Sequence, residues 1–328
     1  MDDDDDGNRR SRLPVDQEDT DPDPGQLEDA AIDDSVSSLS IASTRWNYFL
    51  EHGRWYQDYH NIGYAFPQDD GSLRNEGWTQ LLMLYLFDDK HFLAPVDASK
   101  LRNVLDVGTG HGLWPENVAD AHPDCHITAL DTLPKTTVHP NITFQNMDIS
   151  QEWIFDNEDL RFDLIHLRAL FGTLSSTTWP GVYEQSLRFL RPGGWVEHIE
   201  YGSMAYCDDG TEKADSLIVR LAHLSHEMGG AMNLEFSVAE QAADRLRAAG
   251  FINVRETKYK LPLGQWWQHP RYKEIGRLFE HYYKTGLHGW LIAPLTRGMK
   301  FPEEDVDDFC KRAFDEIDSG QHHYYFYL

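Results

Sequence analysis

The chain has 328 residues, 41% of them hydrophobic, which is enough to bury the core of one large domain or two smaller ones. Acidic residues outnumber basic residues by 55 to 29, for a formal net charge of −26. Residues 1–34 carry −11 of that charge, so the rest of the chain keeps −15. Because such an acidic protein repels phosphate backbones, we expect no nucleic-acid partner.

The cysteines and the apolar stretches favour a soluble protein inside the cell. Cys125, Cys207 and Cys310 are widely spaced and form no Cys/His pattern typical of a metal site, so we expect no metal. No stretch approaches the roughly 18 apolar residues of a membrane span. The start of the chain, with five aspartates, is unlike a signal peptide. We expect no membrane association and a location in the cytoplasm or the nucleus.

Residues 1–40 are rich in Asp, Ser, Pro and Gly, and they predict a disordered acidic tail. This tail is either a solvated segment without a specific role or a docking segment for protein partners. Residues 41–100 follow as a predicted helical cap at the N-terminal end of the folded part. They include an aromatic-rich stretch and a buried helix over 77–87.

From residue 101 to residue 328 we expect one α/β domain. Short apolar runs alternate with helical stretches, which is typical of a parallel sheet with crossover helices. The expected strands are 103–107, 126–131, 141–148, 162–167 and 195–201, and the expected helices between them are 112–122 and 180–190. An α/β insert over about 205–300 follows the last strand, with helices at 213–228 and 237–249 and paired strands over 251–264. A helical stretch over 270–317 precedes an aromatic C-terminal tail.

The first strand of this domain runs into a glycine-rich turn. Gly108, Gly110 and Gly112 are spaced GxGxG before a helix, and Asp106 lies at the end of the strand. Glycine lets the backbone turn sharply and approach a ligand, and the helix start offers free N–H groups. A dinucleotide site would have GxGxxG, and an acid beside the turn would repel its pyrophosphate. The acid suits the ammonium and sulfonium of S-adenosylmethionine (SAM) better, and a turn without a ligand is the remaining alternative.

Two more acids end the next two strands. Asp131 ends the second strand, where a carboxylate can accept both hydroxyls of a ribose. Asp148, followed by Ile149, ends the third strand, where it can accept a hydrogen bond from the adenine amino group. Because ligands of open α/β sheets bind outside the carboxyl ends of the strands, these acids predict one nucleoside site together with the turn.

These motifs resemble the class I SAM-dependent methyltransferases, and within them the fungal LaeA-like methyltransferase group of secondary metabolism. The resemblance covers residues 53 to about 328 and depends on GRWYQDYHNIGYAFPQDD (53–70), VLDVGTGHGLW (104–114), ITALDTLP (127–134), FDLIHLRALFG (162–172), LRPGGWVEHIEY (190–201) and HHYYFYL at the end. It implies a Rossmann-like sheet, SAM as cofactor and S-adenosylhomocysteine as product. The residues depart from the group at His111, where relatives often have Thr or Ser.

The resemblance also implies roles for individual residues. The methionine half of SAM would contact the glycine turn, the ribose and adenine would contact the ends of the next two strands, and the fourth strand would border the carboxylate and sulfonium. An aromatic residue or two from the N-terminal element would close over the cofactor. The residues implied for the methionine half are Asp106, Gly108, Thr109, Gly110 and Gly112; those for the ribose are Asp131 and Thr132; and those for the adenine are Met147, Asp148 and Ile149. Leu167 and Arg168 are implied at the end of the fourth strand, and Tyr56 and Tyr64 in the N-terminal element.

Methyl transfer from a sulfonium is an in-line displacement, so alignment of the two reactants supplies much of the acceleration. A general base is needed only where the acceptor must lose a proton. Glu200 and His166 are the candidate catalytic residues. Glu200 is equally typical of an ion-pairing acid at a strand end, and His166 of a histidine that only supports its neighbours.

We expect the acceptor to be a small organic molecule, methylated at O or N, and to be a fungal secondary metabolite. Aromatic walls suit a large flat acceptor, although most such residues pack the core. The candidates are Trp266, Trp267, His269, Tyr272, Phe279, Tyr282 and Tyr283, with Met228, Met232 and Phe236. Two alternatives stay open: a nuclear regulator of secondary metabolism acting through protein partners, and a SAM-binding protein with a non-methylating activity.

Overall fold

A computed structural model describes residues 47–58, 64–133, 135, 137–212 and 215–328. The acidic tail expected over 1–40, and residues 41–46 of the expected cap, lie outside the described residues. Within the described part of the chain, no helix is both long and apolar enough to cross a membrane.

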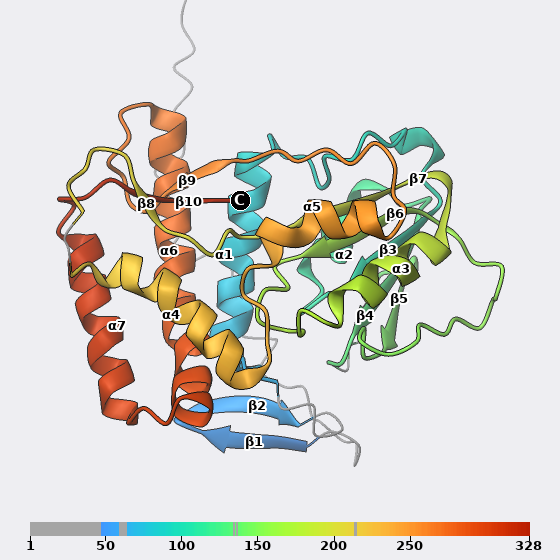
Figure 1. Ribbon diagram of the computed structural model, residues 1–328. Helices are drawn as coiled ribbons and strands as arrows, with labels where there is room; N and C mark the ends of the chain where they lie inside the picture. Colours follow the sequence, from blue (N-terminus) through green and yellow to red (C-terminus); the bar gives the residue numbers. More distant parts are fainter. Residues whose placement is uncertain (1–46, 59–63, 134, 136, 213–214) are drawn as a thin grey trace, which may run out of the picture. The chain divides into compact units, whose positions relative to one another are not determined.

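The centre of the fold is a five-stranded parallel sheet in the order β5-β4-β3-β6-β7 (Figure 1). Its strands are β3 (Asn103–Val107), β4 (His126–Asp131), β5 (Ile142–Asn146), β6 (Phe162–Arg168) and β7 (Leu190–Ile199). The predicted α/β fold with a parallel sheet is therefore confirmed. β7 begins earlier than expected because Leu190 already pairs with Phe162, and the register then shifts before Leu164 pairs with Trp195.

Helices cover both faces of this sheet, and the side chains of β3 alternate between them. Val104 packs in a core cluster with Trp114 of α2 (Leu113–Ala121). Leu105 and Val107 pack in a different cluster, which contains Trp179 of α3 (Trp179–Phe189) and the first residue of α5 (Val238–Ala248). Strands buried on both faces read as continuous apolar runs, which is why β3 and β6 were recognisable in the sequence.

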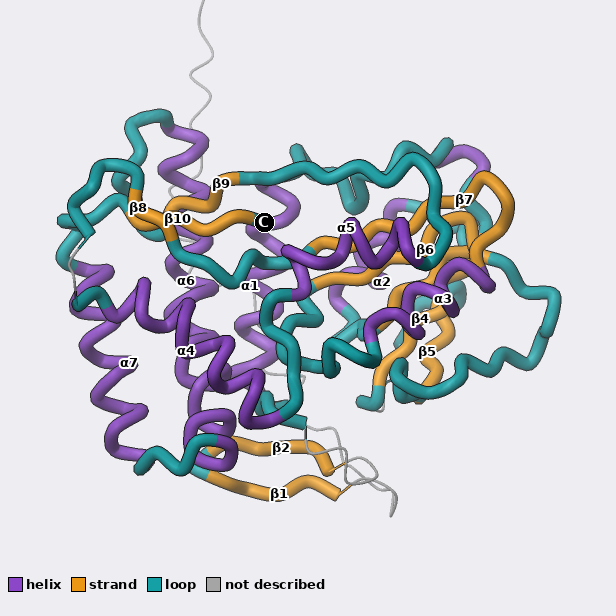
Figure 2. The backbone as a smooth tube through the Cα atoms, viewed as in Figure 1, coloured by secondary structure: helices purple, strands orange, loops and turns teal. Residues whose placement is uncertain are grey.

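A second group of helices packs around its own core, separate from the two clusters of the sheet. It contains α1 (Asp70–Leu86), α4 (Leu217–Met232), α6 (Pro270–Ala293) with the π-helical turn η4 (Pro294–Gly298), and α7 (Glu303–Asp318). A small antiparallel sheet joins this group in the order β8-β10-β9, with strands Tyr206–Cys207, Tyr324–Tyr327 and Lys260–Pro262 (Figure 2). The predicted strand pair over 251–264 is wrong, because β9 pairs with the C-terminal β10 instead.

The N-terminal element differs from the all-helical cap that was expected. It begins with a hairpin of β1 (Asn47–Glu51) and β2 (Arg54–Asp58), and it ends with a short 3-10 helix (Ala98–Lys100) before β3. α1 starts at Asp70, before the expected residue 77, because Asp69 and Ser72 form a capping box. Arg54 donates to both carboxylate oxygens of Asp69, at 2.6 and 2.8 Å, and so holds the hairpin against the start of α1.

Candidate active site

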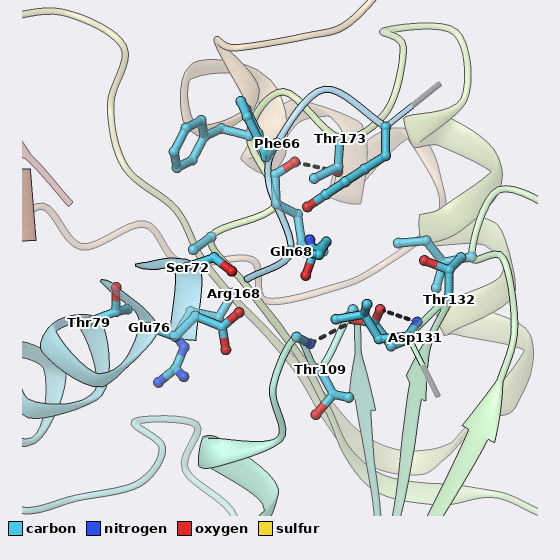
Figure 3. A pocket seen from close by; sticks show the side chains of 18 of the residues that line it. Phe66, Gln68, Ser72, Glu76, Thr79, Thr109, Asp131, Thr132, Arg168 and Thr173 are labelled. Carbon is cyan, nitrogen blue, oxygen red and sulfur yellow. Dashed lines mark hydrogen bonds between the residues drawn. The ribbon is translucent and has the colours of Figure 1, made fainter. Parts of the chain in front are cut away.

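A cavity of about 210 Å³ lies at the carboxyl ends of β3, β4 and β6 (Figure 3). This is the edge of an open α/β sheet where ligands bind. Of the residues expected at the cofactor site, eleven line this cavity: Tyr64, Asp106, Gly108, Thr109, Gly110, Asp131, Thr132, Met147, Asp148, Ile149 and Arg168. The catalytic candidate His166 lines it too. The structure therefore brings together most of the residues that the sequence separates.

The turn after β3 depends on its glycines. Gly108, Gly110 and Gly112 have φ angles of +71°, +58° and +86°, in the left-handed region that favours glycine. A Cβ on Gly110 would lie 2.7 Å from Oε1 of Glu76, and a Cβ on Gly112 would lie 2.9 Å from the Phe144 ring. Gly112 thus packs against β5 and does not line the cavity.

Asp131 connects the glycine turn to the end of β4. Its Oδ2 accepts from the Gly110 N–H at 2.7 Å, and its Oδ1 accepts from the Leu133 N–H at 2.9 Å (Figure 3). Burial raises the pKa of Asp131 to about 6, although the two N–H groups oppose the rise. A carboxylate can accept about four hydrogen bonds, so two positions remain for ligand hydroxyls.

Asp106 and His166 lie opposite each other on the adjacent strands β3 and β6. His166 Nδ1 lies 2.8 Å from Asp106 Oδ1, and both side chains are almost completely buried. The imidazole stacks in parallel on Trp114, with ring centroids 3.7 Å apart. His166 Nε2 has no hydrogen-bond partner among the described residues. The histidine thus holds the Asp106 carboxylate at the wall of the cavity.

Arg168 places a cation in the same wall. Its Nη1 donates to Gln80 Oε1 at 2.8 Å, and among the residues that the structure describes it forms no ion pair. Burial lowers the pKa of Arg168, while the charges of Asp106 and Glu76 oppose the change. A guanidinium remains protonated in proteins, so this group is available to an anionic part of a ligand.

Glu76 is a lining residue that the sequence did not reveal. It extends from α1 over the glycine turn, where Oε2 accepts from the His111 N–H at 2.8 Å and Oε1 lies 2.7 Å from His111 Nδ1. Burial would raise the pKa of Glu76, but the charge and the hydrogen bonds of His111 bring it below its usual value. The unusual His111 of this chain therefore has a partner, and Figure 3 shows Glu76 beside Arg168.

Asp148 and its neighbours form the wall beyond the end of β5. The Asp148 carboxylate accepts from the backbone N–H of Ser150 at 2.9 Å, which fixes its direction. Ile149 is buried, and its carbonyl accepts from the Trp153 indole N–H at 3.0 Å. This part of the cavity joins one carboxylate to the apolar side chains of Met147 and Ile149.

Four predicted site residues lie elsewhere. Tyr56 is buried under Arg297, whose guanidinium carbon lies 4.3 Å from the ring centroid, and Leu167 packs in the core beneath the sheet. Gly112 faces Phe144. Glu200 accepts from the backbone N–H groups of Leu170, at 2.8 Å, and Tyr201, at 3.0 Å, and it does not line the cavity. Glu200, predicted as a candidate catalytic residue, therefore lies outside the cavity lining, and its carboxylate satisfies the backbone after β6 and β7.

Besides Glu76, the cavity has other lining residues to which the sequence assigned no role. They belong to the segment before α1, to α1 and α2, to the loop after β6 and to α6, and they include Gln57, Phe66, Gln68, Ser72, Asn75, Thr79, Trp114, Leu170, Phe171, Thr173 and Trp290. Of the aromatic acceptor candidates, Tyr282 lines the cavity. Trp266, Trp267 and Tyr272 form a separate stack that continues to His323.

A parallel sheet with a glycine turn and acids at three strand ends defines a nucleoside-binding α/β protein of the methyltransferase kind. The family described as a methyltransferase domain matches residues 78–256, which is more than half of the chain. The chain belongs to this family and is a SAM-dependent methyltransferase.

Curated relatives match along most of the chain. "Methyltransferase pytC" of Aspergillus terreus is 29% identical over 287 residues, which cover 84% of this chain and 84% of the relative. "Secondary metabolism regulator LAE1" of Gibberella fujikuroi is 32% identical over 283 residues, which cover 84% of this chain and 89% of the relative. The predicted resemblance to the LaeA-like group is thereby confirmed.

Proposed function

We propose that this chain transfers the methyl group of SAM to an O or N atom of a small organic acceptor, and that the acceptor belongs to fungal secondary metabolism. The observation that carries the proposal is the composition of the cavity. Carboxylates and a cation line it together with the glycine turn, and Phe171, Tyr282 and Trp290 add aromatic rings to the lining. The names of the relatives support the metabolic setting.

The residues present fit SAM group by group. The left-handed glycine turn is a cradle that a Cβ would fill, and beside it Asp131 and Thr132 would hold the ribose. Met147, Asp148 and Ile149 would hold the adenine, which is flat and apolar apart from its edge. When bound, SAM supplies an electrophilic methyl group, which leaves as the acceptor atom bonds to it and the carbon–sulfur bond breaks.

The amino-acid end of SAM carries an ammonium and a carboxylate, and the cavity offers a partner for each. Glu76 and Asp106 are carboxylates near the glycine turn, and we propose that they receive the ammonium. We propose that Arg168, which lacks an ion pair in the described part of the chain, receives the carboxylate. Charge-assisted contacts of this kind fix orientation as well as affinity.

We assign His166 the role of a positioning residue. Its Nδ1 faces the Asp106 carboxylate, and its ring is stacked on Trp114 inside the protein. Most of the acceleration would then come from alignment of the acceptor with the methyl group, which contributes up to about 7–11 kcal/mol. His166→Gln is expected to weaken the binding of S-adenosylhomocysteine without changing the pH profile of turnover, whereas loss of a base would change that profile.

The test is methyl transfer from SAM labelled in its methyl group to a panel of phenols, aryl amines and carboxylic acids. We expect labelled product with at least one phenol or amine, and loss of it in Asp131→Ala. Val138→Ala, at a site that is 94% exposed, is the matched control and should keep full activity. Absence of product from the whole panel, with SAM bound, would contradict the proposal.

The names of several relatives, which are called secondary metabolism regulators, favour a second function, the regulation of secondary metabolism. For that function we propose that the chain acts through protein partners in the nucleus. In that case residues 1–40 would serve as the docking segment, although they lie outside the described residues. Replacing residues 2–6 by asparagine in the full chain tests this. Loss of a specific partner, with SAM binding kept and no small molecule methylated, would favour the regulator over the enzyme.

A further inference from the structure

A second cavity, of about 100 Å³, lies among α4, α6, β10 and the segment that follows β7. None of the residues that line it is charged, and most are aromatic or aliphatic; they include Tyr201, Ala222, Met228, Phe236, Phe279 and Tyr283. A charged ligand group would lose its water here without gaining an ionic partner, which is strongly unfavourable. The lining therefore selects a neutral, mostly apolar molecule.

Three aromatic residues, Phe171, Tyr282 and Trp290, line both this cavity and the one at the glycine turn. The Trp290 ring lies 5.0 Å from Tyr282 and 5.8 Å from Phe171, measured between centroids. The indole also covers Gly286, where a Cβ would lie 2.1 Å from Trp290 Cζ2. Trp290 can hold this position only because residue 286 has no side chain. The wall shared by the two cavities thus consists of aromatic rings.

We propose that the second cavity holds the ring system of the methyl acceptor and that the acceptor is a neutral aromatic molecule with a phenolic hydroxyl or an aryl amine. The atom to be methylated would extend past Phe171, Tyr282 and Trp290 into the first cavity. This inference rests on the proposed methyltransferase function, for which it names the class of acceptor. Flat rings gain offset stacking against aromatic walls, in addition to the burial of their area.

A buried hydroxyl adds a polar requirement. Tyr283 is 5% exposed, and its hydroxyl has no hydrogen-bond partner among the described residues. Burial raises the pKa of Tyr283, so the hydroxyl keeps its proton and acts as a donor at neutral pH. Tyr283 also lines the second cavity, so we propose that a carbonyl or hydroxyl oxygen on the acceptor ring accepts from this hydroxyl, whose unsatisfied burial is costly.

The chemistry balances without a further reactant. The acceptor oxygen or nitrogen forms the new bond to the methyl carbon, and the carbon–sulfur bond of SAM breaks with its electron pair left on sulfur. The products are the aryl ether or N-methyl amine and S-adenosylhomocysteine. The proton of the phenol or amine leaves to solvent.

The test uses 2-naphthol as the probe and the full-length protein saturated with S-adenosylhomocysteine. Ala222 of α4 is 3% exposed and lines the second cavity but not the first, so Ala222→Phe fills the proposed ring site. Ala248→Phe on the exposed end of α5, which lines neither cavity, is the matched control. In equilibrium dialysis we expect Ala222→Phe to weaken naphthol binding at least tenfold, while Ala248→Phe keeps it.

The affinity for S-adenosylhomocysteine should be the same in both variants, which separates this site from the cofactor site. If Ala222→Phe does not fold, Tyr283→Phe replaces it, with a dihydroxynaphthalene as probe and a threefold or larger loss expected. Naphthol bound without methyl transfer supports the ring site and overturns only the proposed function. Failure of the wild-type protein to bind naphthol, or equal binding by Ala222→Phe, would overturn the inference.

Discussion

Asp131→Asn tests the cofactor site because it removes one charge and changes little in shape. Asp131 already accepts the N–H groups of Gly110 and Leu133, and the proposed ribose contacts would use its remaining lone pairs. The asparagine amide has one acceptor oxygen, so it cannot serve both backbone donors and both ribose hydroxyls. Hydrogen bonds to a charged group contribute about 1.5–3 kcal/mol each. Loss of one such bond corresponds to a decrease in affinity of about 10–150-fold.

The assay is calorimetric titration of the wild-type and variant proteins with S-adenosylhomocysteine and, separately, with adenosine. Both ligands contain the ribose, so both should lose affinity by a similar factor. Equal affinity of the wild type and the variant for both ligands would refute the assignment of Asp131 to the ribose. A loss for S-adenosylhomocysteine alone would place Asp131 at the amino-acid end instead.

The same residue gives the binding a predictable pH dependence. Burial raises the pKa of Asp131 to about 6 in the free protein, and hydroxyls that donate to the carboxylate favour its ionised form. The ligand therefore binds best above pH 6, and the affinity falls up to tenfold for each pH unit below it. Asp131→Asn should lack this dependence between pH 5 and pH 7. A wild-type affinity that is constant over that range would contradict the role of an ionised Asp131.

Other predictions concern Glu76 and Glu200. Glu76→Gln should weaken the binding of S-adenosylhomocysteine about tenfold, because it removes a charge from the proposed ammonium site. The affinity for adenosine, which lacks the ammonium, should be unchanged. Calorimetry with both ligands checks this, and an equal loss of affinity for adenosine would contradict it. Glu200→Gln places an amide donor opposite one of the backbone N–H groups of Leu170 and Tyr201. Glu200→Gln should lower the free energy of unfolding, measured in urea, by about 1–3 kcal/mol, with little change in ligand affinity. Unchanged stability together with a loss of turnover would instead support Glu200 as a catalytic residue.

The parts of the fold that the sequence predicted are those set by local patterns. β3, β4 and β6 appear as apolar runs because both faces of these strands are buried, and the turn after β3 is marked by glycines at positions with positive φ. The register of Asp106 beside His166 follows once β3 and β6 are neighbours.

The parts that the sequence did not predict depend on distant partners. β9 pairs with residues 325–327, so the residues before it do not form the hairpin that their own pattern favoured. Glu76 is 35 residues from His111 in the chain, and no local signal joins the two. The sequence marked Glu200 as an acid at a strand end, but its hydrogen bonds to the backbone of Leu170 and Tyr201 are set by tertiary structure.

The central claim is that the cavity at the glycine turn binds SAM, and titration of the full-length protein with S-adenosylhomocysteine tests it most directly. Gly110→Arg is the matched variant, since the residue has a φ of +58° and any Cβ would lie 2.7 Å from Glu76. Thermal unfolding of Gly110→Arg is the control that checks whether the variant is folded. We predict micromolar binding at one site in the wild type and none in Gly110→Arg. Failure of the wild-type protein to bind, or equal binding by Gly110→Arg, would contradict the claim.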